Sequence, residues 1–127
     1  MNKLNKLTEE RLNLNKVEIN NRMGSKVNDV RLNAHNKLMH EIAKAYLCYK
    51  MLKAEKKFLT EAKFTAGGRP DIYSLSDDEA VEILCSETEK NCEIKAIDYP
   101  VEKLTMRTTG DVLREMLKDL EDEGFVR

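Results

Sequence analysis

The sequence predicts a single α/β domain in which helices flank a mixed four-stranded sheet. Three observations support this prediction. The chain has 127 residues, enough for one domain with a core of two packed layers. Segments whose apolar residues recur every three or four positions are followed by shorter segments in which apolar and polar residues alternate. Glycine, proline or a helix-capping residue separates most of these segments.

The clearest helix is predicted over residues 34–57. Glu41 falls in the same arc as the apolar residues of this helix, so we expect its side chain to face the core, whereas Lys44 is expected to point elsewhere. His35 and His40 are about 140° apart around the helix, so we expect surface histidines or DNA contacts rather than paired metal ligands. The apolar residues that set the period are Leu38, Ile42, Ala45, Tyr49 and Leu52.

Three short strands are predicted after this helix. Residues 58–64 alternate as a half-buried strand does, and residues 71–75 and 80–85 form the next two strands around a four-residue turn. A competing interpretation makes residues 76–86 helical, because Ser76 and Glu79 have the spacing of a capping box. We favour the strand because residues 71–75 need a partner.

The remaining segments complete the order helix, strand, strand, strand, helix, strand, helix. A helix is predicted over residues 86–99, and Pro100 ends it. Residues 101–107 alternate as a fourth strand. A final helix over residues 110–123 has one apolar face and stops at Gly124.

The N-terminal residues 1–33 are rich in Asn and Lys, and we treat them as a basic segment preceding the domain of residues 34–127. Their apolar residues fit no period cleanly. They predict either a helix that Thr8 caps or a partly ordered arm, with a break at Gly24 and Ser25.

Charge is distributed unevenly along the chain, although the net charge is only -1. Residues 1–64 contain 14 Lys and Arg against 7 Asp and Glu, and residues 65–127 contain 8 against 16. This asymmetry favours a phosphate-attracting side next to an acid-rich side that attracts metal ions. Two ordinary solvated faces are an equal alternative.

Several classes of protein are disfavoured. No apolar run approaches the roughly 20 residues that a membrane helix needs, and the N-terminus lacks the pattern of a secretory signal, so a cytoplasmic protein is expected. Cys48, Cys85 and Cys92 form no close pair, which argues against a disulfide framework or zinc knuckle. We interpret them as reduced thiols packed like small hydrophobic residues.

Asp71 and Glu82 stand in strand-like apolar segments, where an ionised carboxylate loses hydration unless a positive charge meets it. If Leu75 pairs with Ala80, Asp71 faces Leu84 and lies diagonally from Glu82 on the same face. Two such carboxylates can bind one Mg²⁺. A shift of one residue would separate them. The alternatives are a turn-forming Asp71 and a solvent-facing Glu82 on an edge strand.

The order αβββαβ and the acids within it resemble the PD-(D/E)xK nuclease superfamily, which has the restriction-endonuclease-like fold. The resemblance covers about residues 34–107, and the run of residues 81–86 with the following helix is similar to Holliday-junction-resolvase-like and competence CoiA-like members. It is carried by Pro70-Asp71 at the start of the second strand, by Glu82 within residues 81–86, and by Tyr99-Pro100 after the following helix.

The resemblance implies that Asp71 and Glu82 bind Mg²⁺ or Mn²⁺, with Glu41 as an auxiliary acid. The family has a lysine two residues after the second acid, where this chain has Leu84. Lysine could instead come from another position, and the candidates are Lys63, Lys90 and Lys95. Alternatively, Glu87 and Glu89 form an ExE variant of the motif, although the helix dipole alone also explains acids there.

The implied activity is metal-dependent hydrolysis of phosphodiester bonds in DNA, with RNA as a less favoured substrate. Lys44, Lys63 and Arg69 would contact the phosphate backbone, and a domain of this size would act as a homodimer. Two other functions remain open. One is a catalytically degenerate nucleic-acid-binding protein on the same fold, and the other is a viral or mobile-element module that binds a protein partner through its acidic half.

Overall fold

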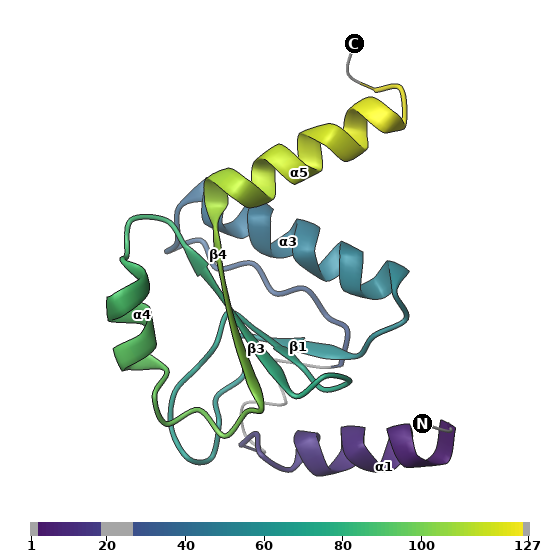
Figure 1. Ribbon diagram of the computed structural model, residues 1–127, viewed down its shortest axis with the longest axis vertical. Coiled ribbons are helices and arrows are strands. Elements are labelled where there is room, and N and C mark those ends of the chain that lie inside the picture. The colour runs from purple at the N-terminus through teal and green to yellow at the C-terminus, as the bar shows by residue number, and fades with distance from the viewer. Residues whose placement is uncertain (1–2, 19–26, 126–127) are drawn as a thin grey trace.

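The computed structural model describes residues 3–18 and 27–125, which form an α/β structure with four helices around a mixed four-stranded sheet (Figure 1). The predicted break at Gly24 and Ser25 lies outside the described residues. The elements in chain order are α1 (Lys3–Leu14), α3 (Leu38–Lys53), β1 (Phe58–Thr60), β2 (Ile72–Ser74), β3 (Glu79–Leu84), α4 (Glu89–Lys95), β4 (Lys103–Thr108) and α5 (Thr109–Asp122).

The sheet has the order β1-β2-β3-β4. The first three strands are antiparallel neighbours, and β4 runs parallel to β3. Parallel neighbours need a crossover connection, which α4 provides. The predicted order of helices and strands after residue 33 is therefore confirmed, and β3 is a strand rather than the competing helix.

The hairpin of β2 and β3 has a different register from the predicted one. Tyr73 pairs with Ala80, where we expected Glu82, and Ile72 pairs with Val81. The turn takes up the difference, with Asp78 in the left-handed region at φ 51°. Because the shift is two residues, every side chain keeps its predicted face of the sheet.

The first strand is shorter than predicted. It covers only Phe58–Thr60, and all three residues are buried, so the expected alternation of a half-buried strand is wrong here. Layers on both sides of the sheet bury both of its faces. Glu61 then takes a left-handed backbone with φ 57°, which ends the strand. Phe64, expected within the strand, forms an isolated bridge with Val17.

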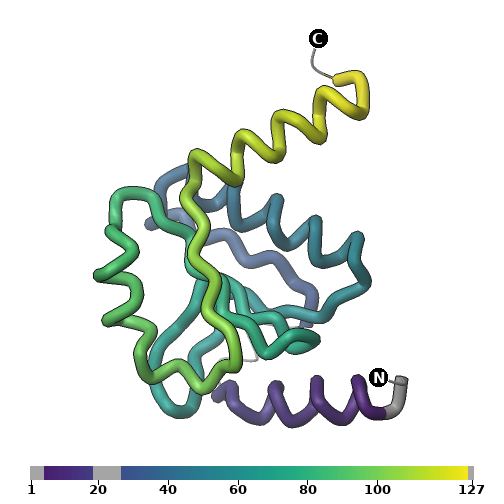
Figure 2. Tube along the Cα trace, in the orientation of Figure 1, coloured from purple at the N-terminus to yellow at the C-terminus, as the bar shows by residue number. Residues whose placement is uncertain are grey.

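Helices cover both faces of the sheet (Figure 1). On one face, α3 and α5 pack on Ile72, Val81 and Ile83. On the other face, α1 and the residues after α4 pack on Tyr73 and Ala80. Figure 2 shows α1 and α5 at opposite ends of the molecule.

The face that α3 turns to the core differs from the predicted one. Leu38, Tyr49 and Leu52 are exposed, whereas Glu41 and Lys44 are buried. Apolar residues occupy much of the circumference of this helix, so its period alone does not select a face. Glu41 was expected to face the core, and this is confirmed. The expectation that Lys44 points away from the core is wrong, because its ammonium pairs with carboxylates inside the protein.

The described part of the N-terminal segment packs on the domain. Asn13 Nδ2 donates a hydrogen bond of 2.7 Å to the carbonyl of Leu75, and Lys16 forms an ion pair of 2.9 Å with Asp78. Val17 is buried in the core beside the sheet. Thr8 lies inside α1 rather than at its start, so it is not the predicted cap.

Two threonines begin the later helices. Thr88 accepts a hydrogen bond from the backbone N–H of Asn91, and Thr108 accepts one from Asp111. These caps start α4 three residues later and α5 one residue earlier than predicted. Among the described helices, none is long and apolar enough to cross a membrane.

Candidate functional site

Asp71 directly precedes β2, and Glu82 lies in the second half of the neighbouring strand β3. Continuing the register one step beyond the pair Ile72–Val81 brings Asp71 opposite Glu82. Asp71 Oδ2 also accepts a hydrogen bond of 2.7 Å from the backbone N–H of Ile83. The Asp71 side chain thus takes the place of a backbone acceptor where the ladder ends, which fixes it beside β3.

Glu82 is a buried carboxylate with few compensating partners. Its side chain is only 1% exposed. Tyr99 Oη donates a hydrogen bond of 2.8 Å to Oε1, and Lys95 Nζ lies 3.3 Å from Oε2. Burial and the negative charge of Asp71 together raise the pKa of Glu82 to about 7, against the opposing effects of Tyr99 and Lys95. A further positive charge would stabilise its ionised form.

Lys95 comes from the last turn of α4 and approaches Glu82 from the sheet face that α4 covers. Its Nζ also lies 4.0 Å from Glu87 Oε1, and half of its side chain is exposed. Burial lowers the pKa of Lys95, but the carboxylates of Glu82 and Glu87 outweigh burial and raise it overall. We call Glu82, Glu87 and Lys95 the Glu82 cluster.

His40 connects Glu41 to Asp71. Its Nδ1 lies 2.6 Å from Glu41 Oε2, and its Nε2 lies 3.2 Å from Asp71 Oδ1. The hydrogen bond to Asp71 has the largest effect on the pKa of His40, which burial lowers and Glu41 raises, and the result is a pKa of about 9. His40 is therefore a cation at neutral pH. The expectation of a surface histidine is wrong, because only 12% of its side chain is exposed.

Glu41 is held by several donors. Lys44 Nζ lies 2.7 Å from its Oε1 and 3.0 Å from Glu61 Oε1, and the backbone N–H of Asn33 donates to Glu41 Oε1 at 2.5 Å. Burial raises the pKa of Glu41, but these donors and His40 outweigh it and lower the pKa to about 2. We call Glu41, Lys44 and Glu61 the Glu41 cluster.

The predicted site residues thus gather in part. Asp71 and Glu82 lie together with Lys95 and Glu87, and Glu41 joins them through His40. Binding of metal by Glu41 stays a prediction.

The residues predicted to contact phosphate do not gather in the same way. Lys44 is fully buried between two carboxylates, which contradicts its predicted contact with phosphate. Lys63 lies 3.9 Å from Glu18, and Arg69 is exposed.

Three residues at the site were missed by the sequence analysis: His40, Tyr99 and Cys92. Tyr99 was interpreted as the end of a helix and as part of the family resemblance, but not as a partner of Glu82, although it stands four positions after Lys95. Cys92 is buried as expected of a packed thiol, and its Sγ lies near Glu82 and Glu87. Cys85 is exposed, so its expected packing is wrong. The signal for His40 was its position next to an inward-facing Glu41.

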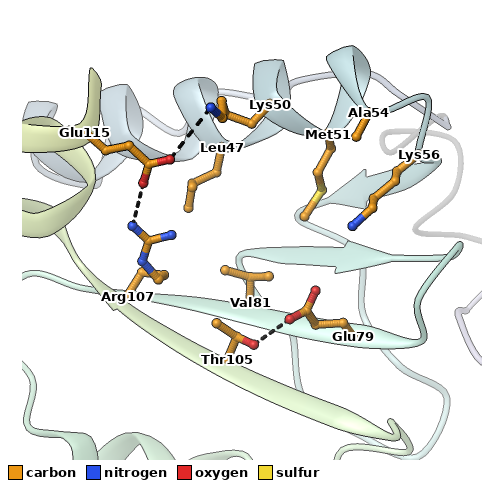
Figure 3. A pocket seen from close by; sticks show the side chains of 10 residues that line it. All are labelled: Leu47, Lys50, Met51, Ala54, Lys56, Glu79, Val81, Thr105, Arg107 and Glu115. Carbon is orange, nitrogen blue, oxygen red and sulfur yellow. Dashed lines mark hydrogen bonds and ion pairs between the residues drawn. The ribbon is translucent and has the colours of Figure 1, made fainter. Parts of the chain in front are cut away.

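A hollow of about 210 Å³ lies on the other face of the sheet, between α3, α5 and the strands β3 and β4 (Figure 3). Its charged lining is paired within the protein. Arg107 binds Glu115 at 2.8 Å, Lys50 lies 3.8 Å from Glu115, and Lys56 pairs with Asp77 at 2.8 Å. The candidate site is therefore assigned to Asp71 and Glu82, where the partners of a buried carboxylate do not balance its negative charge.

Comparison with known proteins identifies no relative: no family model matches the chain, and neither a curated protein nor a solved structure matches it significantly.

Proposed function

We propose that the protein is a metal-dependent nuclease that hydrolyses phosphodiester bonds of DNA. The observation that carries the proposal is the meeting of Asp71, Glu82 and Lys95 at one end of the β2–β3 hairpin. Two carboxylates and a lysine are the groups that this chemistry needs for binding a cation and for stabilising negative charge.

The restriction-endonuclease-like fold is part of this proposal. It is supported by the order αβββαβ between α3 and β4 and by the mixed sheet that helices cover on both faces. The lysine that the family has two residues after the second acid is replaced by the buried Leu84. Lys95 on α4 reaches the same acid from the next helix, which supports a relocated lysine.

The donor set fits Mg²⁺ or Mn²⁺. Glu82 is buried beside Asp71, and its pKa is raised because burial and the negative charge of Asp71 outweigh the effects of Tyr99 and Lys95. Hard divalent cations prefer such oxygen ligands. Asp71 and Glu82 would hold the ion, which would polarise the phosphate and favour ionisation of the attacking water.

The other residues have roles that follow from their contacts. Lys95 has a half-exposed ammonium that can stabilise negative charge developing on the phosphate, and Glu87 holds it in position. His40 orients Asp71 as a positioning residue, and Glu41 holds His40. Lys63 and Arg69 would contact the DNA backbone, and the active form would be a homodimer, which light scattering can test.

The test is cleavage of end-labelled DNA with Mg²⁺ or Mn²⁺, using single-stranded, duplex and branched substrates. Asp71→Asn should lower the cleavage rate by about 10²-fold or more, and Lys95→Met should lower the rate while DNA binding is retained. The matched control is Asp77→Asn, in the turn of the same hairpin, whose partner on the surface is Lys56. It should cleave like the wild type.

The outcomes separate the candidate functions. Equal cleavage by wild type and Asp71→Asn would exclude this site. Salt-sensitive DNA binding without cleavage by either protein would favour the non-catalytic binding protein. Neither binding nor cleavage would favour the protein-interaction module.

A further inference from the structure

Cys92 is a fully buried thiol between two carboxylates. Its Sγ, one oxygen of Glu82 and one oxygen of Glu87 all lie within 4.8 Å of one another. Cys92 has no exposed surface, and its Sγ makes no hydrogen bond with any residue that the structure describes. Burial alone is ordinary for a free cysteine, which packs like a small hydrophobic residue. The observation that points to a ligand is that two carboxylate oxygens lie within 4.8 Å of this buried sulfur.

Local helix geometry brings Glu87 and Cys92 together. Thr88 caps α4, so Glu87 precedes the cap and Cys92 is the fourth residue of the helix. These two positions touch in many helices, where both usually carry apolar side chains that pack as a hydrophobic staple. Here the two positions carry the acid Glu87 and the thiol Cys92, and the carboxylate of Glu82 on β3 lies beside both. The three ligands therefore come from β3, from the connection that follows it and from α4, which are consecutive along the chain.

The ammonium of Lys95 lies next to the two carboxylates of this group. Lys95 Nζ lies 3.3 Å from Glu82 and 4.0 Å from Glu87. Because half of the Lys95 side chain is exposed, its ammonium can turn outward into water while its stem remains on α4. The two carboxylates would then be available to another cation.

We propose that Glu82, Glu87 and Cys92 form a binding site for a thiophilic divalent cation such as Zn²⁺, which displaces the ammonium of Lys95. One oxygen from each carboxylate and the Cys92 sulfur bind the ion, and the thiol releases its proton to water as the metal–sulfur bond forms. Water completes the four-coordinate shell. Tetrahedral Zn–O and Zn–S bonds of about 2.0–2.3 Å place ligand atoms about 3.3–3.5 Å apart, so atoms now within 4.8 Å of one another would close by up to about 1.5 Å.

The thiolate sets the selectivity of the site. Mg²⁺ takes oxygen ligands and gains nothing from sulfur, whereas Zn²⁺, Cd²⁺ and Co²⁺ accept a thiolate with two carboxylates. This site shares Glu82 with the pair Asp71–Glu82 but uses the α4 side of its carboxylate, where Lys95 now lies.

One consequence rests on the proposed nuclease function. A thiophilic ion in this site removes Lys95 from its position and engages Glu82, so Zn²⁺ should inhibit cleavage supported by Mg²⁺. Glu87→Gln should be less sensitive to Zn²⁺ than the wild type. The binding of the ion itself does not depend on nuclease activity.

The experiment is a titration of the protein with Co²⁺ in the absence of DNA, which follows the cobalt–thiolate charge-transfer absorption. Cys85→Ser removes the exposed thiol and serves as the parent protein. It should bind one equivalent with a charge-transfer band, and Cys85→Ser/Cys92→Ser should show no band, with circular dichroism confirming its fold. In the parent background, Glu87→Gln should weaken binding by about tenfold or more, whereas Glu89→Gln, on the first turn of the same helix, should not change it.

An equal band in the protein without Cys92, or no band in the parent, would overturn the proposal. An unchanged affinity in Glu87→Gln would also contradict it. Asp71→Asn distinguishes this proposal from the nuclease, because it should lower the cleavage rate by about 10²-fold or more and keep the cobalt band. A band without cleavage by the wild type would support the thiophilic site and refute the proposed function.

Discussion

The Glu41 cluster and the Glu82 cluster each place one lysine between two carboxylates, but only the first cluster buries its lysine. In the Glu41 cluster, Lys44 has no exposed surface and lies within 3.0 Å of both acids. In the Glu82 cluster, the acid is buried and the lysine is half exposed. The first arrangement holds its own charges together, and the second leaves a buried acid whose cation can leave.

The pKa values of the two central acids show the same difference. Burial raises the pKa of both Glu41 and Glu82. Lys44, Asn33, Asn36 and His40 then lower the pKa of Glu41 to about 2, whereas Glu82, beside Asp71, reaches about 7. The pKa values of these two glutamates therefore differ because Glu82 is more deeply buried, lies beside the negative charge of Asp71 and has fewer donors around it. An external cation would therefore bind most favourably at Glu82, whose negative charge has fewer donors around it.

The largest effect on stability is expected from Lys44→Met. This change leaves Glu41 and Glu61 without their shared cation inside the protein, so it should lower the free energy of unfolding by about 3–5 kcal/mol in urea denaturation. Lys37→Met, at the exposed position before α3, should stay within about 0.5 kcal/mol of the wild type. A loss below about 1 kcal/mol for Lys44→Met would break the contrast between the two clusters.

Gly68→Ala should have the next largest effect, because it tests the support of Tyr99. Gly67 and Gly68 both have positive φ angles, 108° and 92°, so alanine strains the backbone at either position. At Gly68 the added Cβ also overlaps the ring of Tyr99, whereas at Gly67 it meets nothing. Thermal unfolding should therefore show Gly68→Ala to be less stable than Gly67→Ala by about 1–3 kcal/mol. Equal losses would mean that Tyr99 moves freely.

Glu82→Gln should stabilise the protein at high pH. The folded state raises the pKa of Glu82 from 4.5 to about 7, so it favours the protonated acid and loses stability as the pH rises between these values. The variant avoids this loss. Its free energy of unfolding should exceed that of the wild type by about 1–3 kcal/mol at pH 8, with the gain disappearing below pH of about 4.5. A gain that is independent of pH would show that ionisation of Glu82 is not its cause.

Lys95→Met should have the smallest effect on stability. The Lys95 side chain is half exposed, and Glu82 can take up a proton when its partner is removed, so urea denaturation at pH 6 should change by less than about 1 kcal/mol. Cleavage should nevertheless fall if the protein is the proposed nuclease. A loss of stability as large as that of Lys44→Met would show that the two clusters have the same structural role.

The sequence by itself determined the order of elements after residue 33, because turns and the two hydrophobic periods are local properties. It also predicted that Asp71 and Glu82 share one face of the sheet. This prediction holds although the predicted register differs by two residues from the observed one, because a shift of two leaves every side chain on the same face. The tertiary structure decided the remainder. His40 gained a role only when β2 brought Asp71 to it, and Lys44 was buried only because Glu61, 17 positions later, returned to α3. Partners of a buried charge come from distant parts of the chain, so a local sequence pattern does not predict them.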